Sequence, residues 1–426
     1  MSYSKNSSKN SKKVTKNTKK TQKNATKQEN MIQKAQNLTQ KAKSATKGFK
    51  FSLARLVVFL IVAVITISAG YLFKTPIEDM LNKQVKANAD LSMIDENGLS
   101  VHFIDVGQGD AIAIKFPDGK KMLIDSGKSQ SKDKLIDYLC NVFFEGEDRV
   151  FDFLLLTHCD ADHCGGMVAV CESFVINKIY RPYQYSKYTK DGVVVFDETN
   201  GNSSNKNVCE TMTYYKTIKA FNSEIAEGGE NATIVMTDIT VCNSTQKIEG
   251  EGYYFDFYAP TSTYITTSAG TVENDASPIM CLNYNGKKIM FTGDASITSE
   301  ESAMARATLP DVDLLKVGHH GSATSSGQAF LNQIKPEISV ICVGEGNSYH
   351  HPTNEALNRL ASVGSTVFRT DKNGTIVANI TSGVDAEINM YVGVVNDGGI
   401  YIRVEYLMAG IIILSLGLCF GVKIKL

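Results

Sequence analysis

The amino-acid sequence predicts a layered α/β domain, because short apolar runs that are typical of buried strands alternate with helical segments. Many of these apolar runs end directly in Asp, His, Gly or Ser. The chain has 426 residues, which is enough for one large domain or two ordinary ones. We therefore expect polar side chains to gather at one end of a sheet.

The first part of the chain, residues 1–50, holds fourteen Lys and only one acidic residue, Glu29. The remaining residues carry fourteen more acidic than basic side chains. With almost nothing to bury, residues 1–50 are predicted to be a disordered cytoplasmic tail. The tail either keeps the protein soluble and orients it, or binds anionic lipid or nucleic acid.

Two apolar runs predict membrane-spanning helices at one or both ends of the chain. Leu56–Phe73 is eighteen residues without a charge, and Arg55 and the Lys-rich tail precede it. This predicts a transmembrane helix in 51–74 and a linker in 75–97; a cleavable signal peptide is the alternative. The run in 404–424 predicts a second span or a final buried helix. Lys on the inner side places the N-terminus in the cytoplasm and the domain outside the cell membrane.

The globular domain is predicted in 98–390. A hairpin turn at Pro117–Gly119 is expected between its second and third strands. Residues 180–250 are less regular, apart from a helix near 208–221. The expected strands are 99–104, 111–116, 121–124, 151–156, 253–258, 279–284, 288–291, 314–317 and 338–343, and the other expected helices are 135–144 and 167–174.

The strand predicted at 151–156 leads into a dense group of potential metal ligands, His158-Cys-Asp-Ala-Asp-His163-Cys-Gly-Gly. Alternate residues of an extended turn point the same way, so His158, Asp160 and Asp162 can converge beside His163. Imidazole and carboxylate groups bind zinc, manganese or iron. A polar loop without metal is the alternative, but four such side chains repel one another or lose solvation unless a cation lies among them.

Six of the seven histidines lie in loops that follow predicted strands, and His102 stands apart as a structural residue. The order HxDxDHxGG, then TGD ending in Asp294, then HHGS at His319 and His320, then HP at His351 resembles the metallo-β-lactamase superfamily of hydrolases. The segments FIDVGQGD (103–110), DSG (125–127), NDAS (274–277) and TDKNG (370–374) make the resemblance greatest to the hydrolase domain of ComEC-type DNA-uptake competence proteins. The resemblance covers residues 99–385.

This resemblance implies a four-layer αββα sandwich with two divalent metal ions at one edge of the sheets. It implies that His158 and Asp160 hold one metal, that Asp162 and His163 hold the other, and that Asp294 bridges both. We assign His319 to the second metal, but the sequence leaves open whether His319 or His320 is the ligand. Proton donation is assigned to His320 or His351, and Asp162 is also counted among the catalytic residues. Residues expected to support the ligands or touch substrate are Asp105, Gln108, Asp110, Asn274, Asp275 and Lys316.

The first metal site departs from the commonest superfamily pattern. Asp160 stands where many members have a His, and a third His is absent near 273–275. Zinc is the expected metal, and the oxygen-rich ligands make manganese the alternative.

The predicted function is a membrane-anchored, metal-dependent phosphodiesterase or nuclease that acts on extracellular DNA. One alternative is hydrolysis of a small ester, a lactone or a cell-surface phosphodiester, and another is a scaffold whose catalytic site has degenerated. The acidic domain weighs against DNA, because nucleic-acid affinity comes mainly from Lys and Arg. Nine Cys without a C-x-x-C pair suggest a reducing compartment, against the predicted location. No protein partner is indicated.

Overall fold

The structure of the protein is a computed structural model that describes residues 53–72, 91–202, 207–228, 233–237, 248–260, 273–394, 408–409, 411–413 and 415. The chain divides into two compact units. One comprises Met1–Leu81 with Ile402–Leu426, and the other comprises Asn82–Tyr401. The predicted tail 1–50 and most of the segments 75–97 and 404–424 lie outside the described residues.

The larger unit contains two large β-sheets. The first has eight strands in the order β11-β7-β5-β3-β2-β1-β19-β20. Its strands are β1 (Leu99–Phe103), β2 (Ile112–Lys115), β3 (Lys121–Ile124), β5 (Phe153–Leu155), β7 (Lys178–Pro182), β11 (Thr233–Thr237), β19 (Thr375–Ile380) and β20 (Ile388–Val394). Strands β2 and β3 form the predicted antiparallel hairpin, with Ile112 opposite Ile124.

The second sheet has seven strands in the order β12-β13-β14-β15-β16-β17-β18. Its last four strands are parallel, and the others are antiparallel. Its strands are β12 (Glu249–Gly250), β13 (Tyr253–Ala259), β14 (Ile279–Tyr284), β15 (Lys287–Phe291), β16 (Leu314–Lys316), β17 (Ile338–Ile341) and β18 (Thr366–Arg369).

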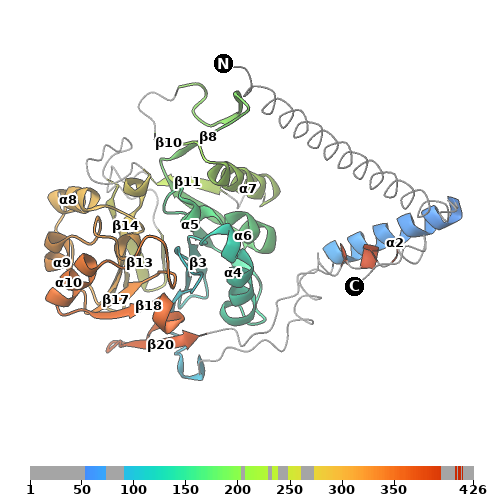
Figure 1. Ribbon diagram of the computed structural model, residues 1–426. Helices are drawn as coiled ribbons and strands as arrows, with labels where there is room; N and C mark the ends of the chain where they lie inside the picture. Colours follow the sequence, from blue (N-terminus) through green and yellow to red (C-terminus); the bar gives the residue numbers. More distant parts are fainter. Residues whose placement is uncertain are drawn as a thin grey trace, which may run out of the picture. The chain divides into compact units, whose positions relative to one another are not determined.

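Helices cover the outer face of each sheet, which gives four layers (Figure 1). One group packs on the first sheet: α4 (Lys132–Tyr138), α5 (Ala161–Cys164), α6 (Met167–Ser173) and α7 (Met212–Gly228). The other packs on the second sheet: α8 (Ile297–Arg306), α9 (Gln328–Ile334) and α10 (Asn354–Ser362), while the short α11 (Thr370–Asn373) follows β18. The α/β sandwich predicted from the sequence is therefore confirmed.

Three apolar cores separate the four layers, and the strand periodicity explains them. In β14, Met280 and Leu282 point into the core between the sheets, whereas Cys281 points into the core under α8, α9 and α10. This alternation is the two-residue period of a strand that is buried on both faces. Both sheets are thus held rigidly, which fixes the loops at their ends.

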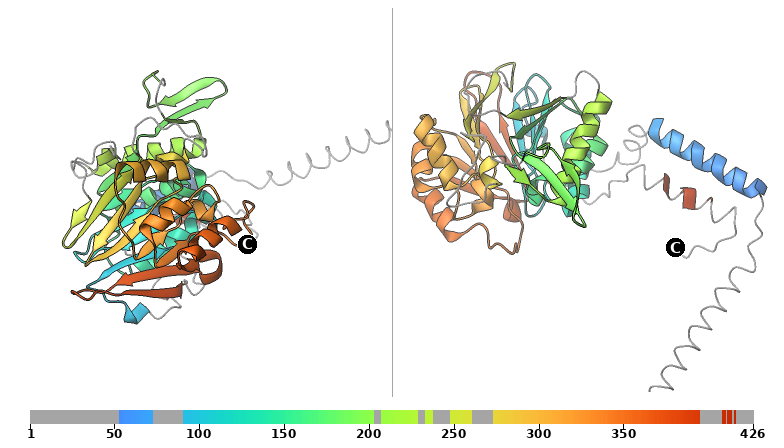
Figure 2. Two further views of the ribbon diagram at one scale, coloured as in Figure 1. Left: turned by 90° about the vertical axis from the view of Figure 1, so that its left-hand side faces the viewer. Right: turned by 90° about the horizontal axis from the view of Figure 1, so that it is seen from above.

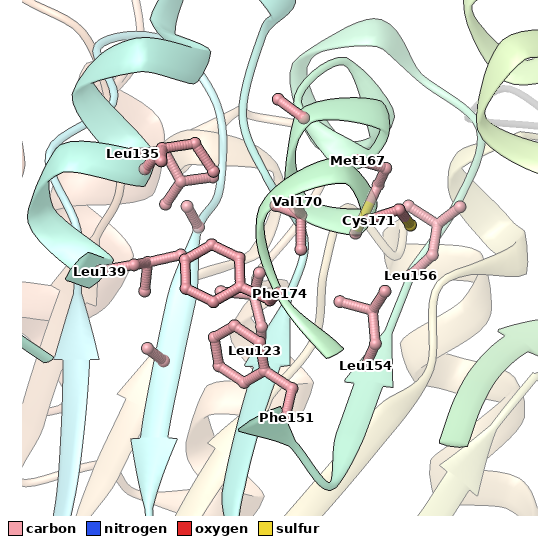
Figure 3. Packing of buried hydrophobic residues seen from close by; sticks show 14 of the residues in the cluster. Leu123, Leu135, Leu139, Phe151, Leu154, Leu156, Met167, Val170, Cys171 and Phe174 are labelled. Carbon is pink, nitrogen blue, oxygen red and sulfur yellow. The ribbon is translucent and has the colours of Figure 1, made fainter. Parts of the chain in front are cut away.

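The core between the first sheet and its helices shows why α6 forms where it does (Figure 3). Met167, Val170 and Cys171 recur at helical spacing, and all three are buried against the sheet. Phe174 follows the helix and stacks on Phe144, with ring centroids 5.3 Å apart. This packing anchors the segment that comes directly after the metal-ligand loop.

Several element boundaries differ from those expected from the sequence. The expected strand 151–156 is divided at Asp152: β4 (Val150–Phe151) pairs with β6 (Val175–Ile176) in a separate two-stranded sheet, and β5 lies in the first sheet. The Asp152 carboxylate accepts a hydrogen bond from the Lys121 backbone N–H at 2.9 Å. Residues 180–250 also contain a small sheet of β8 (Tyr185–Lys190), β9 (Val193–Asp197) and β10 (Val208–Cys209), and the β8–β9 hairpin projects from the layers (Figure 2). A partly buried ion pair between Arg181 and Glu198, at 2.7 Å, ties this sheet to the end of β7.

The smaller unit contains α2 (Leu53–Leu72), which covers the first predicted membrane span. Its described side chains include exposed Val58, Val64 and Ile65. Within the described parts of the chain, no helix has the length and apolar character needed to cross a membrane.

Candidate metal centre

The candidate site lies where the parallel strands of both sheets end. Strands β3, β5 and β7 run in one direction, and β15, β16 and β17 are parallel to one another in the second sheet. Carboxyl ends of parallel strands meet at the same edge of a sheet. Asp125 follows β3 and His158 follows β5, while Asp294 follows β15 and His319 follows β16.

Asp294 from the second sheet lies among histidines from both sheets. Its Oδ1 is 3.3 Å from His163 Nε2, and its Oδ2 is 4.0 Å from His158 Nε2. The same Oδ2 is 3.5 Å from His319 Nε2 and 3.6 Å from His320 Nε2. The Asp294 carboxylate thus lies between the histidines of the first sheet and those of the second sheet, which is the position expected of a bridging ligand.

Hydrogen bonds fix the orientation of His163 and His158. His163 Nδ1 donates to Asp125 Oδ2 at 2.7 Å. The Thr157 hydroxyl donates to the same Asp125 oxygen at 2.7 Å, so its lone pair accepts from His158 Nδ1 at 3.0 Å. With their Nδ1 atoms acting as donors, both rings present an Nε2 lone pair to the cluster.

His320 is oriented in the same way from the other sheet. Its Nδ1 donates to the Cys342 backbone carbonyl at 2.8 Å and lies 3.3 Å from Asp110 Oδ1. Asp110 in turn pairs with Lys316, whose Nζ is 2.6 Å from Asp110 Oδ2. All three side chains are buried, so Lys316 supports the site from below and is not positioned to contact substrate.

The backbone that carries the two adjacent histidines is strained. His319 has φ 47° and His320 has φ 54°, in the left-handed region that L-residues rarely adopt. Such conformations cost on the order of 1–3 kcal/mol each and persist at functional sites where surrounding contacts impose them. The turn points both rings toward Asp294 at once.

The two adjacent histidines differ in burial. His320 is 1% exposed, and its Nε2 lies 3.7 Å from Asp162 Oδ2, which places it with Asp162 and His163. The His319 side chain is 28% exposed, and its Nδ1 lies 3.3 Å from the Asn274 amide. The structure therefore places His320 deep in the cluster and His319 at its mouth.

Charges in the cluster shift the pKa values of its members. Burial disfavours the charged form of His163, but the carboxylates of Asp294 and Asp125 outweigh burial and raise its pKa well above the usual value. Burial likewise opposes ionisation of Asp294, yet His163, His320 and His319 hold its pKa well below the usual value. The site thus favours positive charge beside Asp294, which either a proton on His163 Nε2 or a cation bound to the lone pair of that nitrogen can supply.

Of the remaining residues predicted from the sequence, Asp160 lies at the edge of the cluster, and the others hydrogen-bond to the backbone of nearby loops. Asp160 lies at the edge of the cluster, 3.6 Å from His158 Nε2, with a 43% exposed side chain. Asp105 pairs with Lys134 at 2.7 Å and accepts from the Gly107 N–H, which is a turn role. Gln108 accepts from the Gly344 N–H at 3.2 Å, and Asp275 accepts from the Ser296 N–H at 3.1 Å before α8.

Two residues that hydrogen-bond to the predicted ligands, Asp125 and Ser277, are absent from the candidates chosen from the sequence. Asp125 holds His163, and Ser277 lies between His158 and Asp294: its hydroxyl is 3.3 Å from His158 Nδ1 and accepts from the Asp294 N–H at 3.1 Å. Asp125 directly follows a strand, as the ligands do, so the same rule could have found it. Ser277 ends the NDAS segment (274–277), so that segment could have pointed to it.

The residues fit a bound metal. The buried Nε2 atoms of His158, His163 and His320 and the Asp294 Oδ1 atom have no hydrogen-bond partner. Buried polar atoms are almost always paired, and these four lie together with their lone pairs facing inward. Two groups, His158–His163–Asp294 and Asp162–His163–His320, each bring one ligand atom per residue within 4.8 Å of the others. Divalent cations held by these residues would satisfy all four atoms, with the single Nε2 lone pair of His163 binding only one cation.

A buried cluster of His and Asp at the edge of a two-sheet sandwich is an arrangement that can hold metal ions. Residues 104–222 and 273–345 match the family model of the metallo-beta-lactamase superfamily, so this part of the chain is similar to a domain of that superfamily.

The chain is also similar to ComEC-type competence proteins. It is 25% identical over 289 residues to ComE operon protein 3 of Bacillus subtilis, covering 65% of this chain and 32% of the relative. It is 26% identical over 279 residues to Recombination protein 2 of Haemophilus influenzae, covering 66% and 28%. Competence protein ComA of Neisseria gonorrhoeae is 26% identical over 292 residues, covering 68% and 33%. The chain therefore spans about a third of the length of these curated relatives.

Among solved structures, the fold comparison finds the metallo-beta-lactamase fold protein YhfI from Bacillus subtilis, with 10% identity and a TM-score of 0.33. That comparison covers 64% of this chain and 96% of YhfI.

Proposed function

We propose that this chain is a metal-dependent hydrolase that cleaves phosphodiester bonds, with DNA as its substrate. The observation that carries the proposal is the convergence of three imidazole nitrogens and one carboxylate oxygen, all buried and without hydrogen-bond partners. The superfamily match and the intact set of ligands speak against a degenerate scaffold.

The ligand groups suggest two metal positions that share Asp294. His158, with Asp160 at its edge, serves the first, and Asp162, His163 and His320 serve the second. We assign the second-site ligand role to His320 rather than to His319, because His320 is the more deeply buried and lies with Asp162 and His163. The mixture of nitrogen and oxygen ligands suits zinc or manganese.

Two divalent cations in such a site supply an activated water and neutralise the charge that develops on a phosphate. The protein's own contribution is orientation. Asp125 and the Cys342 carbonyl hold the Nδ1–H groups of His163 and His320, which keeps both Nε2 atoms facing inward. Lys316 neutralises Asp110, so that this carboxylate can lie beside His320 without an unpaired buried charge.

We assign contact with the leaving group to His319 and His351, at the mouth of the site. Their ring centroids are 5.6 Å apart. Burial, followed by the charges of His319 and His320, lowers the pKa of His351 to about 4. The ring is therefore neutral at pH 7 and serves as an N–H hydrogen-bond donor to a phosphate or leaving oxygen rather than as an imidazolium acid.

We also propose that the chain is anchored in the cell membrane, with the domain outside. The support is the uncharged run Leu56–Phe73 after a Lys-rich tail, and the similarity to competence proteins. Protease added to intact cells should remove the domain, whereas protection of residues 90–390 would reverse this topology.

The functional test uses the full chain purified in detergent and loaded with Zn²⁺ or Mn²⁺. Single- and double-stranded DNA, a bis-aryl phosphodiester and a lactone are offered in parallel. Cleavage of DNA that disappears in Asp162→Ala and Asp294→Ala is expected. Turnover of the lactone or a small ester with no cleavage of DNA would favour the alternative substrates. The excess of acidic over basic residues after position 50 is the observation that favours these alternatives.

A further inference from the structure

We propose that Tyr349 and Lys128 form a subsite that stacks an unpaired nucleobase beside the mouth of the metal centre. The inference rests on the proposed function and narrows its substrate to a nucleic-acid strand whose bases are accessible. It is drawn from a row of rings that leads outward from the cluster to an exposed aromatic side chain.

The row of rings begins at the metal centre. His319 Nε2 is 3.5 Å from Asp294 Oδ2, and the His319 ring lies edge-on to the His351 ring at 5.6 Å. The Tyr349 ring lies nearly parallel to the His351 ring, with an interplanar angle of 21° and centroids 5.9 Å apart. The rings of His351 and His319 therefore lie between Tyr349 and the Asp294 carboxylate of the metal centre.

The loop that presents Tyr349 is braced from within. The Asn347 amide donates to the Gly344 carbonyl at 3.0 Å and to the His351 carbonyl at 2.7 Å. Its oxygen accepts from the His351 N–H at 3.0 Å. A single side chain thus closes the loop on both sides of Tyr349, so the ring is held in position before any ligand binds.

Tyr349 is 57% exposed, whereas Tyr180 and Tyr214 are fully buried in the same domain. An aromatic ring that is more than half exposed gains only part of the stabilisation that full burial would give. It offers a flat apolar face, which is what base stacking uses in proteins that bind single strands. The exposure of this ring is explained if a planar ligand covers it.

Lys128 supplies the positive charge that a phosphate backbone requires. Its Nζ lies 5.6 Å from the centroid of the Tyr349 ring. The residue follows Gly127, whose N–H is bonded to the Asp110 carbonyl at 2.7 Å, so its backbone is tied to the metal centre. Among the described residues, none of the ion pairs involves Lys128, which leaves this cation available for a ligand.

A ring at this position can distinguish strands whose bases are unpaired from strands whose bases are stacked in a duplex. In a duplex, the bases are stacked and paired, so their faces do not reach a protein ring unless the helix is opened. A single strand presents its bases freely, and each base has a face that can stack. We therefore expect a preference for single strands over duplexes, without a strong sequence preference.

The test measures equilibrium binding of the metal-loaded full chain in detergent by fluorescence anisotropy, with phosphorothioate linkages in the probes to prevent hydrolysis. The probes are a labelled oligothymidine and an abasic phosphodiester chain of the same length and charge. The wild type should bind the base-bearing strand about 5- to 150-fold more tightly. Tyr349→Ala should abolish this ratio, and Tyr349→Phe should preserve it.

Tyr254→Ala is the matched control, because Tyr254 is 49% exposed at the start of β13, the end of the second sheet remote from the metal centre. It should leave the ratio as in the wild type. Lys128→Ala should weaken binding of both probes and reduce the slope of log affinity against log salt by about 0.7.

Equal affinity of the wild type for the two probes, or an unchanged ratio in Tyr349→Ala, overturns the proposal. Failure to bind either probe overturns it too. In each of these cases, hydrolysis of ordinary phosphodiester strands of the same two kinds by the metal-loaded chain would leave the proposed phosphodiesterase function standing, so the two failures are distinguishable.

Discussion

His102 should make the stability of the domain depend on pH. Its ring is buried, with Nδ1 2.8 Å from the Tyr138 hydroxyl and Nε2 3.1 Å from the Ser100 hydroxyl. Burial, with a smaller contribution from the charge of Lys115, lowers its pKa from 6.5 to about 3. Between these two values the unfolded chain binds a proton that the folded chain does not. The stability that the neutral ring contributes is therefore complete above pH 6.5 and is lost as pH falls toward 3.

The size of the effect follows from the pKa difference. At pH 5, the free energy of unfolding should be about 2 kcal/mol lower than at pH 7.5 through His102 alone. Urea unfolding of the wild type and of His102→Gln, followed by circular dichroism at both pH values, isolates this contribution because other titrating groups cancel. The difference between the two proteins should shrink by about 2 kcal/mol at pH 5. A difference that is the same at both pH values would refute the reasoning.

Three further perturbations test the metal centre. Asp294→Asn should abolish metal binding, measured by elemental analysis, and a chelator should then lower the melting temperature of the wild type but not of the variant. Asp125→Asn should weaken metal affinity about 10- to 100-fold, measured by competition with a chromogenic chelator, because His163 loses the carboxylate that orients it; unchanged affinity would contradict that role. Lys316→Met should lower the free energy of unfolding by about 3–5 kcal/mol, because Asp110 is left as an unpaired buried charge, and Asp110→Asn in the same chain should recover part of the loss.

The positions of the strands and of the ligand loop were accessible from the sequence. Apolar runs such as Ile279–Tyr284 match their strands, and the polar residues that follow β5 and β15 lie at the site. These features are local, since strand periodicity and turn chemistry act over a few residues. The small sheet β8-β9-β10 in 180–250 was not predicted. Strands β8 and β10 lack an apolar run, and the apolar run of β9, Val193–Val195, is exposed rather than buried in a core.

The choice between His319 and His320 could not be made from the sequence. The two residues are adjacent and chemically identical, and both have positive φ values in the same turn. Their different roles arise from contacts with distant residues: the Cys342 carbonyl and Asp110 hold His320 inside, while His319 lies at the mouth. The support from Ser277 and Lys316 is of the same kind.

The sequence by itself determined the layered α/β domain and the identity of most ligand-type residues, because both depend on short-range patterns of apolar and polar side chains. Only the tertiary structure decided which nitrogen of each histidine faces the site, which carboxylates lie beneath it, and that Tyr349 lies exposed two rings from Asp294. The physical reason is that the site is assembled across two sheets, where residues far apart in the chain fix each other's protons and orientation.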